Sequence, residues 1–244
     1  MAVTRVELER VFRRGISLTL DALYPSRCVG CHRHGTPLCD TCIASAVPAS
    51  GEGRCANCAA EWLEPDGYCP RCLGWTHLNG ARAAFEHAGV ARRSVHALKY
   101  GRQTIIAPVM AAAMRDRFDL TGFDAGLAIP LHPSRRKRRG FNQGDRLLPH
   151  LSLAPLPGQL LRRRKTRSQV GMSLEQRRRN VAGAFAYDGA ELDGLRVALI
   201  DDVITTGATA DECAAVLKDY GAAEVIAVAF TRMSYRPGTP GIED

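Results

Sequence analysis

The fold is decided by the stretch Val197-Ala-Leu-Ile-Asp201-Asp202-Val203-Ile-Thr205-Thr206-Gly207-Ala-Thr209. Its apolar beginning, Arg196–Ile200, predicts a buried strand that ends in two adjacent acids. A short loop of small and hydroxyl residues follows, and a helix is predicted over Ala208–Tyr220. A strand, a loop and a helix in this order form the repeating unit of a parallel α/β sheet.

The loop has the composition of a phosphate site. Backbone N–H groups at a helix start lack partners, and the helix dipole favours an anion there. Three threonines add hydroxyl donors, and Gly207 lets the backbone approach a ligand closely. A threonine N-cap alone would explain the hydroxyls, but two adjacent carboxylates repel each other unless hydroxyls or a cation neutralise them. The stretch therefore fits a ribose 5-phosphate.

Apolar runs and helical patterns alternate on both sides of this stretch. Strands are predicted over Ala83–Gly89, Gly126–Leu131, Ala184–Tyr187 and Glu224–Phe230. Helices are predicted to end at Val95–Tyr100 and to span Thr104–Phe118 and Asn142–Leu151; the second has an apolar face of Ile105, Ile106, Val109, Met110 and Met114. This alternation predicts an α/β domain with a parallel sheet.

Eight of the nine cysteines form four C-x-x-C pairs ahead of this domain: Cys28 and Cys31, Cys39 and Cys42, Cys55 and Cys58, Cys69 and Cys72. Tetrahedral zinc takes four ligands, so the pairs predict two closed, structural four-cysteine sites. Disulfides are the alternative reading. Sequential pairing of the C-x-x-C turns is favoured over an interleaved cross-brace, and His32 and His34 are expected to be exposed. The ninth, Cys213, falls inside the predicted helix as a buried thiol.

The overall composition excludes a membrane-spanning helix. The 244 residues are 45% hydrophobic and 24% charged, which is typical of a globular protein, and they contain no run of eighteen apolar residues. Residues 1–27 predict an amphipathic lead-in helix rather than a signal peptide, because polar residues interrupt their apolar stretch. We expect a cytoplasmic protein without membrane insertion.

The formal net charge of +8 is concentrated in residues 135–179, which hold fourteen Lys or Arg and two acids. This window therefore carries +12 and the rest of the chain −4. Such a density repels itself unless polyanions neutralise it. A few arginines suffice to clamp a pyrophosphate, and the surplus favours a nucleic-acid backbone over a merely solvated loop. Phe141, Trp62 and Trp75 are expected to pack rather than to stack on bases.

The signature at 197–209 closely resembles that of phosphoribosyltransferases that bind phosphoribosyl pyrophosphate. Together with the cysteine pairs, the chain resembles the ComF family, the competence-associated relatives of those enzymes. The resemblance covers roughly residues 20–233. Its other matching stretches are Leu23-Tyr-Pro, Leu98-Lys99-Tyr100-Gly101, Ile129-Pro-Leu-His132-Pro133, Arg138-Arg139-Gly140-Phe141-Asn142-Gln143 and Gln176-Arg177-Arg178-Arg179-Asn180 leading to Gly183-Ala-Phe185.

The resemblance implies roles for individual residues. Asp201 and Asp202 would hold the ribose hydroxyls, and the 5-phosphate would lie against Thr205, Thr206, Gly207, Ala208 and Thr209. Lys99 and Tyr100 match the loop that meets pyrophosphate, with magnesium bridging pyrophosphate and ribose. Residues of a closing, anion-binding loop would be Arg138, Arg139, Asn142, Gln143 and Arg179.

Thr205 stands where enzymes acting on 6-oxopurines usually carry an aspartate as general base, which argues against that substrate class. A transferase activity is thus permitted, with the acceptor and the catalytic residues unassigned. We expect a lead-in at 1–27, a double zinc ribbon at 28–75, a type I phosphoribosyltransferase-like domain at 80–235 and a tail at 236–244. The expected function is phosphoribosyl pyrophosphate binding linked to DNA uptake, with single-stranded DNA and DNA-uptake proteins as partners. The alternative is a non-catalytic protein that handles single-stranded DNA and retains the fold.

Overall fold

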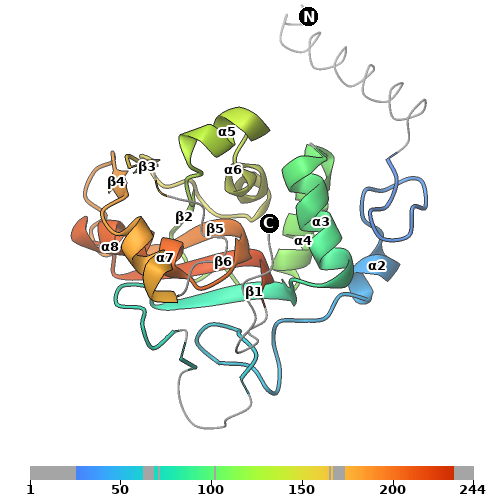
Figure 1. Ribbon diagram of the computed structural model, residues 1–244, viewed down its shortest axis with the longest axis horizontal. Helices are drawn as coiled ribbons and strands as arrows, with labels where there is room; N and C mark the ends of the chain where they lie inside the picture. Colours follow the sequence, from blue (N-terminus) through green and yellow to red (C-terminus); the bar gives the residue numbers. More distant parts are fainter. Residues whose placement is uncertain are drawn as a thin grey trace, which may run out of the picture.

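The computed structural model describes residues 26–62, 69–70, 72–101, 103–164, 166 and 174–233. The expected lead-in helix, apart from its last two residues, and the expected tail at 236–244 lie outside these ranges. Within them, helices and strands alternate along the chain over the larger part of the sequence (Figure 1).

A four-stranded sheet lies at the centre, as the strand–helix alternation predicted. Its strands are β1 (Gly80–Glu86), β6 (Glu224–Arg232), β5 (Arg196–Ile204) and β2 (Ala125–Ala128), in that spatial order, and every neighbouring pair is parallel. Because all four run the same way, their carboxyl ends meet at one edge of the sheet. That edge holds the residues that follow each strand, and it is where open α/β sheets bind ligands.

Side chains alternate between the two faces of the sheet, since successive residues of a strand point to opposite sides. Val197 and Leu199 of β5 belong to one core, while Ala198 and Ile200 belong to the other. The first core is covered by α8 (Ala208–Asp219). The second is covered by α3 (Gly89–Tyr100), the short helix η1 (Thr104–Ile106), α4 (Ala107–Arg115) and α6 (Gln143–Leu147), which continues into η2 (Leu148–His150).

Several predicted boundaries were wrong. The first strand ends at Glu86 instead of Gly89, and β2 ends at Ala128 instead of Leu131. β5 continues to Ile204, so both acids lie inside the strand rather than after it. The segment Ala184–Tyr187 contributes β4 (Phe185–Tyr187), which pairs antiparallel with β3 (Leu160–Arg162) in a separate two-stranded sheet. Ile105, expected on an apolar face, is half exposed.

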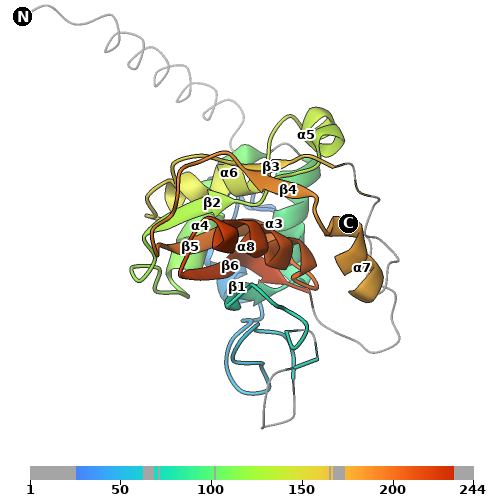
Figure 2. The same cartoon turned by 90° about the vertical axis from the view of Figure 1, so that its left-hand side faces the viewer.

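Three short helices were not predicted from the sequence. They are α2 (Asp40–Ala44), α5 (Pro133–Arg139) and α7 (Leu174–Val181). α5 buries none of its residues, and Figure 2 shows it at the top of the molecule, above the edge of the sheet formed by β2. The sequence Pro-Ser-Arg-Arg-Lys-Arg-Arg has no apolar periodicity, so the pattern that reveals other helices is missing here.

The second part of the cysteine-rich region lies at the opposite edge of the sheet, below β1 (Figure 2), whereas the first part lies beside α2 and α3 (Figure 1). Residues between the two cysteine groups run along this edge strand, where Ala49 N–H donates to the Ala84 carbonyl and Glu86 N–H donates to the Val47 carbonyl. Within the second group, the carbonyl of Asn57 accepts from Ala81 N–H. This contact covers main-chain groups that an edge strand otherwise exposes. Among the described residues, no helix is both long and apolar enough to cross a membrane.

Candidate functional site

The eight paired cysteines form two separate groups in the structure. Cys28, Cys31, Cys39 and Cys42 bring their sulfur atoms within 4.8 Å of one another, and so do Cys55, Cys58, Cys69 and Cys72. This arrangement confirms sequential pairing and rejects the interleaved one. None of these cysteines is in a disulfide, and His32 and His34 are exposed and outside both groups.

The spacing of the sulfur atoms fits zinc. A tetrahedral ion with Zn–S bonds of 2.3 Å separates its sulfur ligands by about 3.8 Å. The distance from Cys28 Sγ to Cys39 Sγ is 3.7 Å, that from Cys55 Sγ to Cys72 Sγ is 3.6 Å, and that from Cys69 Sγ to Cys72 Sγ is 3.7 Å. With four thiolates for each ion, no ligand position remains for a substrate, so both sites are structural.

A second cluster of polar residues lies at the carboxyl edge of the sheet, at the end of β5. Lys99 Nζ, near the end of α3, is 3.2 Å from Asp202 Oδ2, and both side chains are more than nine-tenths buried. No regular hydrogen bond from the described residues reaches Asp202 Oδ2. The structure thus brings together two residues that the sequence singled out, and it gives Lys99 a carboxylate partner.

The environment of Asp201 disfavours its charged form. Burial raises the pKa of Asp201 well above its usual range, and the neighbouring charge of Asp202 raises it further, while Lys99 acts in the opposite direction. Its Oδ1 accepts a hydrogen bond of 2.8 Å from the backbone N–H of Asp202. A cation or a pair of hydroxyl donors beside Asp201 would stabilise its ionised form.

The loop after β5 leads into the start of a long helix, a position at which anions bind in other proteins. Gly207 adopts a left-handed conformation with φ +81° immediately before α8, a conformation that favours glycine. Thr206 Oγ1 accepts a hydrogen bond of 3.3 Å from the Ala208 N–H, the first N–H of α8. Because α8 has twelve residues, its dipole is that of a full helix.

Trp75, expected only to pack, packs against the core and also contacts this loop. Two further residues, Asp211 on α8 and His87 directly after β1, were not predicted. The indole Nε1 of Trp75 donates to the Thr206 carbonyl at 3.0 Å. Asp211, in the first turn of α8, accepts hydrogen bonds from backbone N–H groups of the segment after Trp75. His87 Nδ1 lies 2.9 Å from Thr231 Oγ1 at the ends of β1 and β6. The only signal in the sequence was the position of Trp75 three residues after a zinc ligand.

The residues expected in a closing loop lie at three separate places, on α5, at the start of α6 and on α7. Asn142 and Gln143 are buried at the start of α6, where Asn142 Nδ2 donates to the Ile129 carbonyl at 2.9 Å. Arg139, at the end of α5, places its guanidinium carbon 5.2 Å from the ring centroid of Tyr100, which is 42% exposed. Arg138 is exposed on the same helix.

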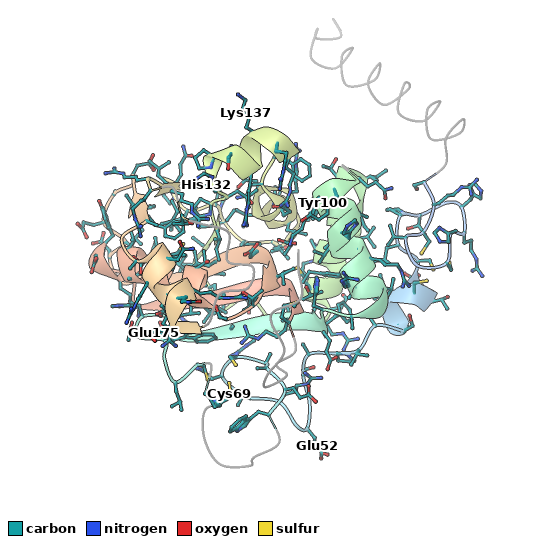
Figure 3. All side chains as sticks on the ribbon, viewed as in Figure 1. Glu52, Cys69, Tyr100, His132, Lys137 and Glu175 are labelled. Atoms are coloured by element: carbon teal, nitrogen blue, oxygen red, sulfur yellow. The ribbon has the colours of Figure 1, made fainter. Side chains whose placement is uncertain are left out.

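The last residue of that set, Arg179, is on a different helix. It lies on α7 and forms an exposed ion pair with Glu175 one turn away. Nothing in its described contacts brings it to the acid pair. In Figure 3, Lys137 extends outward from α5 and Tyr100 lies at the upper end of α3, whereas Cys69 lies below β1. The basic helix and the second cysteine group therefore occupy opposite ends of the molecule.

Comparison with known proteins agrees with this architecture. Residues 19–73 match the model of the double zinc ribbon domain. The DNA utilization protein YhgH of Salmonella typhimurium is 32% identical over 186 residues, covering 70% of this chain and 80% of the relative. Competence protein F of Haemophilus influenzae is 30% identical over 188 residues, with 70% and 81% covered. Competence protein ComFC of Streptococcus pneumoniae is 26% identical over 193 residues, with 76% and 86% covered. The chain belongs to the ComF family.

Proposed function

We propose that the carboxyl edge of the sheet binds phosphoribosyl pyrophosphate with magnesium, in a protein that serves DNA uptake. The observation that carries this proposal is the order of groups along one short path. Two adjacent acids, Asp201 and Asp202, stand near the end of β5, and burial and the neighbouring acid disfavour the charge of Asp201. Four residues separate Asp202 from a left-handed glycine, which stands at the start of a twelve-residue helix. In a ligand with a phosphate at one end and a diol beside it, the phosphate suits the helix start and the diol hydroxyls suit the acid pair.

In this arrangement the main chain and hydroxyls of Thr205, Thr206 and Thr209 receive the 5-phosphate. Asp201 and Asp202 accept hydrogen bonds from the ribose hydroxyls, and Lys99 holds Asp202 in place. Magnesium, when bound, neutralises the pyrophosphate charge and favours its departure. The acceptor of a phosphoribosyl transfer is left open, since Thr205 replaces the base expected for 6-oxopurines.

The test is a calorimetric titration of phosphoribosyl pyrophosphate with magnesium into the zinc-loaded protein. We expect saturable binding at one molecule per chain. Asp202→Asn should weaken binding at least tenfold, equal to about 1.4 kcal/mol, because it removes an acceptor from the site. Asp219→Asn, at the exposed far end of α8, is the matched control and should bind as the wild type does.

Thermal unfolding of Asp202→Asn must accompany this titration, because the substitution also leaves Lys99 without its carboxylate partner. An absence of heat with the folded wild type would reject the proposed ligand. Equal affinities for the wild type and for a folded Asp202→Asn would reject the role given to the acid pair.

A second candidate function, binding of single-stranded DNA, is supported by α5. This helix has five Lys or Arg among its seven residues and buries none of them, and Arg139 at its end adjoins the partly exposed ring of Tyr100. Cations bind the nucleic-acid backbone, and aromatic rings stack on bases. The names of the relatives, competence proteins and a DNA utilization protein, also support a function that involves DNA.

Salt dependence of oligonucleotide binding tests this second candidate. Each phosphate contact on a single strand contributes a slope of about −0.7 in log K against log salt. We expect the double substitution Arg135→Ser with Lys137→Ser to make the slope less steep, whereas Arg92→Ser on α3 should leave it unchanged. An affinity that hardly varies with salt would contradict a phosphate-contacting role for α5.

A further inference from the structure

Arg232, the last residue of β6, is a buried cation beside the second cysteine group. Its side chain is 1% exposed, and none of its three guanidinium nitrogens makes a regular hydrogen bond with the described residues. The ionisable groups that act most on its charge are the thiols of Cys58, Cys69 and Cys72. A buried guanidinium is costly without a counter-charge.

Zinc would supply that counter-charge indirectly. Four thiolates around one divalent ion carry a net charge of −2, and a cation in the surrounding shell stabilises such a site. The position of Arg232 therefore fits a zinc-loaded second site. Its guanidinium carbon also lies 5.9 Å from the ring centroid of Trp75, which places a tryptophan next to this charge.

Trp75 connects the second cysteine group to the proposed phosphate loop. Its backbone N–H donates to the carbonyl of Cys72 at 3.0 Å, and its indole Nε1 donates to the carbonyl of Thr206 at 3.0 Å. A methyl group added at Gly207 would lie only 2.4 Å from a carbon of the Trp75 ring. The indole thus packs directly on the glycine that shapes the loop.

The residues after Trp75 are fixed to the same helix. The carboxylate of Asp211 accepts hydrogen bonds from the backbone N–H groups of Thr76 at 3.1 Å, His77 at 2.9 Å and Leu78 at 2.8 Å. The chain between the last zinc ligand and the start of β1 is therefore tied to the loop and to the first turn of α8. This segment thus contacts the second cysteine group at one end and the loop and α8 along its length.

The first cysteine group has different neighbours. Its loop contacts α3, where Arg93 Nε donates to the Val29 carbonyl at 3.1 Å, and a methyl group at Gly30 would meet Val90. Cys28 belongs to the core on the α3 and α4 face, whereas the four cysteines of the second group belong to the α8 face. The two groups therefore adjoin opposite faces of the sheet.

We propose that zinc at the second site, acting through Arg232 and Trp75 as positioning residues, sets the conformation of the Thr205–Thr209 loop, whereas zinc at the first site does not. The consequence for ligand affinity rests on the proposed function, because it requires that this loop receive the phosphate. The effect of zinc on the conformation of the loop does not depend on the proposed function. Two readouts therefore separate the two claims.

The first readout is amide hydrogen exchange of the peptide spanning residues 204–212 in the full-length, zinc-loaded protein. We expect faster exchange in Trp75→Phe, which keeps an aromatic ring but removes the donor to Thr206. Cys69→Ser should give the same result, with one zinc lost. Cys39→Ser also loses one zinc, at the first site, and should leave this peptide unchanged. Zinc content is measured for every variant with a colorimetric chelator.

The second readout is the affinity for phosphoribosyl pyrophosphate with magnesium. Loss of one hydrogen bond from the loop should weaken binding roughly threefold to tenfold in Trp75→Phe, whereas Cys39→Ser should stay within twofold of the wild type. Trp75→Phe retains both zinc sites, so it keeps the proposal testable even where Cys69→Ser does not fold.

The outcomes distinguish the two proposals. Unchanged exchange of residues 204–212 in Trp75→Phe, or equal effects of Cys39→Ser and Cys69→Ser, would overturn the coupling of the second site to the loop. If the wild type bound no phosphoribosyl pyrophosphate while exchange still responded to Trp75→Phe and Cys69→Ser, the proposed ligand would be rejected and the coupling would be supported.

Discussion

The two four-cysteine groups have the same ligands and the same C-x-x-C spacing, yet they occupy different environments. In the first, Cys31 is exposed and Cys39 and Cys42 are half-buried. In the second, all four cysteines are buried, and they share a core with β5, β6 and α8. The comparison teaches that a C-x-x-C motif predicts which residues bind the metal but not where the metal site lies in the fold. Here the second site is part of the main core and the first adjoins its margin.

The largest expected difference concerns stability. Cys58→Ser should cost about 4–5 kcal/mol or prevent folding, because zinc supplies folding free energy directly and the site lies in the core. Cys31→Ser, at the exposed ligand of the first site, should cost no more than about 2 kcal/mol. Denaturant unfolding with zinc content measured in parallel checks both values. Equal losses of stability would contradict the distinction drawn between the sites.

Arg232 sharpens the comparison, because its counterpart near the first group is exposed. Arg232→Met should destabilise the zinc-loaded protein by about 3 kcal/mol, since it leaves the buried thiolate charge without a cation. Arg93→Met, on the exposed surface of α3 beside the first group, should change stability by less than about 0.5 kcal/mol. Chemical unfolding of the two variants measures the difference. A loss for Arg232→Met as small as that for Arg93→Met would show that the second site needs no counter-ion.

Much of the central sheet could be predicted from the sequence, because β5, β6 and α8 have long apolar patterns of the correct period. The start of β1 was placed at Ala83 because Gly80 and Arg82 give no strand signal; this part of the strand is fixed by its pairing with β6. The sequence did not predict β3, because its three residues, Leu160–Arg162, are too few to show the alternation of apolar and polar side chains that marks a strand. Tertiary contacts decide such short segments.

The candidate site was predicted in part for a similar reason. The acids, threonines and glycine of the loop are consecutive, so their chemistry can be read locally. Trp75 and Asp211 act through contacts with partners more than 130 residues away in sequence, and Arg232 acquires its role only when β6 is placed over the second cysteine group. No local pattern predicts such contacts.

The smallest expected effect concerns the buried carboxylate of Asp201 rather than the thiolates of the zinc sites. The pKa of Asp201 is raised in the folded protein, so its contribution to stability is complete below the unfolded pKa and is lost as pH rises through the folded pKa. Asp201→Asn should therefore be more stable than the wild type by about 1 kcal/mol near pH 8, with a smaller difference in acid. Urea unfolding at both pH values checks this expectation. A variant that is less stable near pH 8 would contradict a raised pKa for Asp201.

The most direct test of the account is a crystal structure of the zinc-loaded protein with phosphoribosyl pyrophosphate and magnesium. The account predicts the 5-phosphate against the N–H groups of residues 205–209, the ribose hydroxyls on Asp201 and Asp202, and the Trp75 indole still on Gly207. Ligand density on α5 alone, or an empty loop at a saturating ligand concentration, would contradict it.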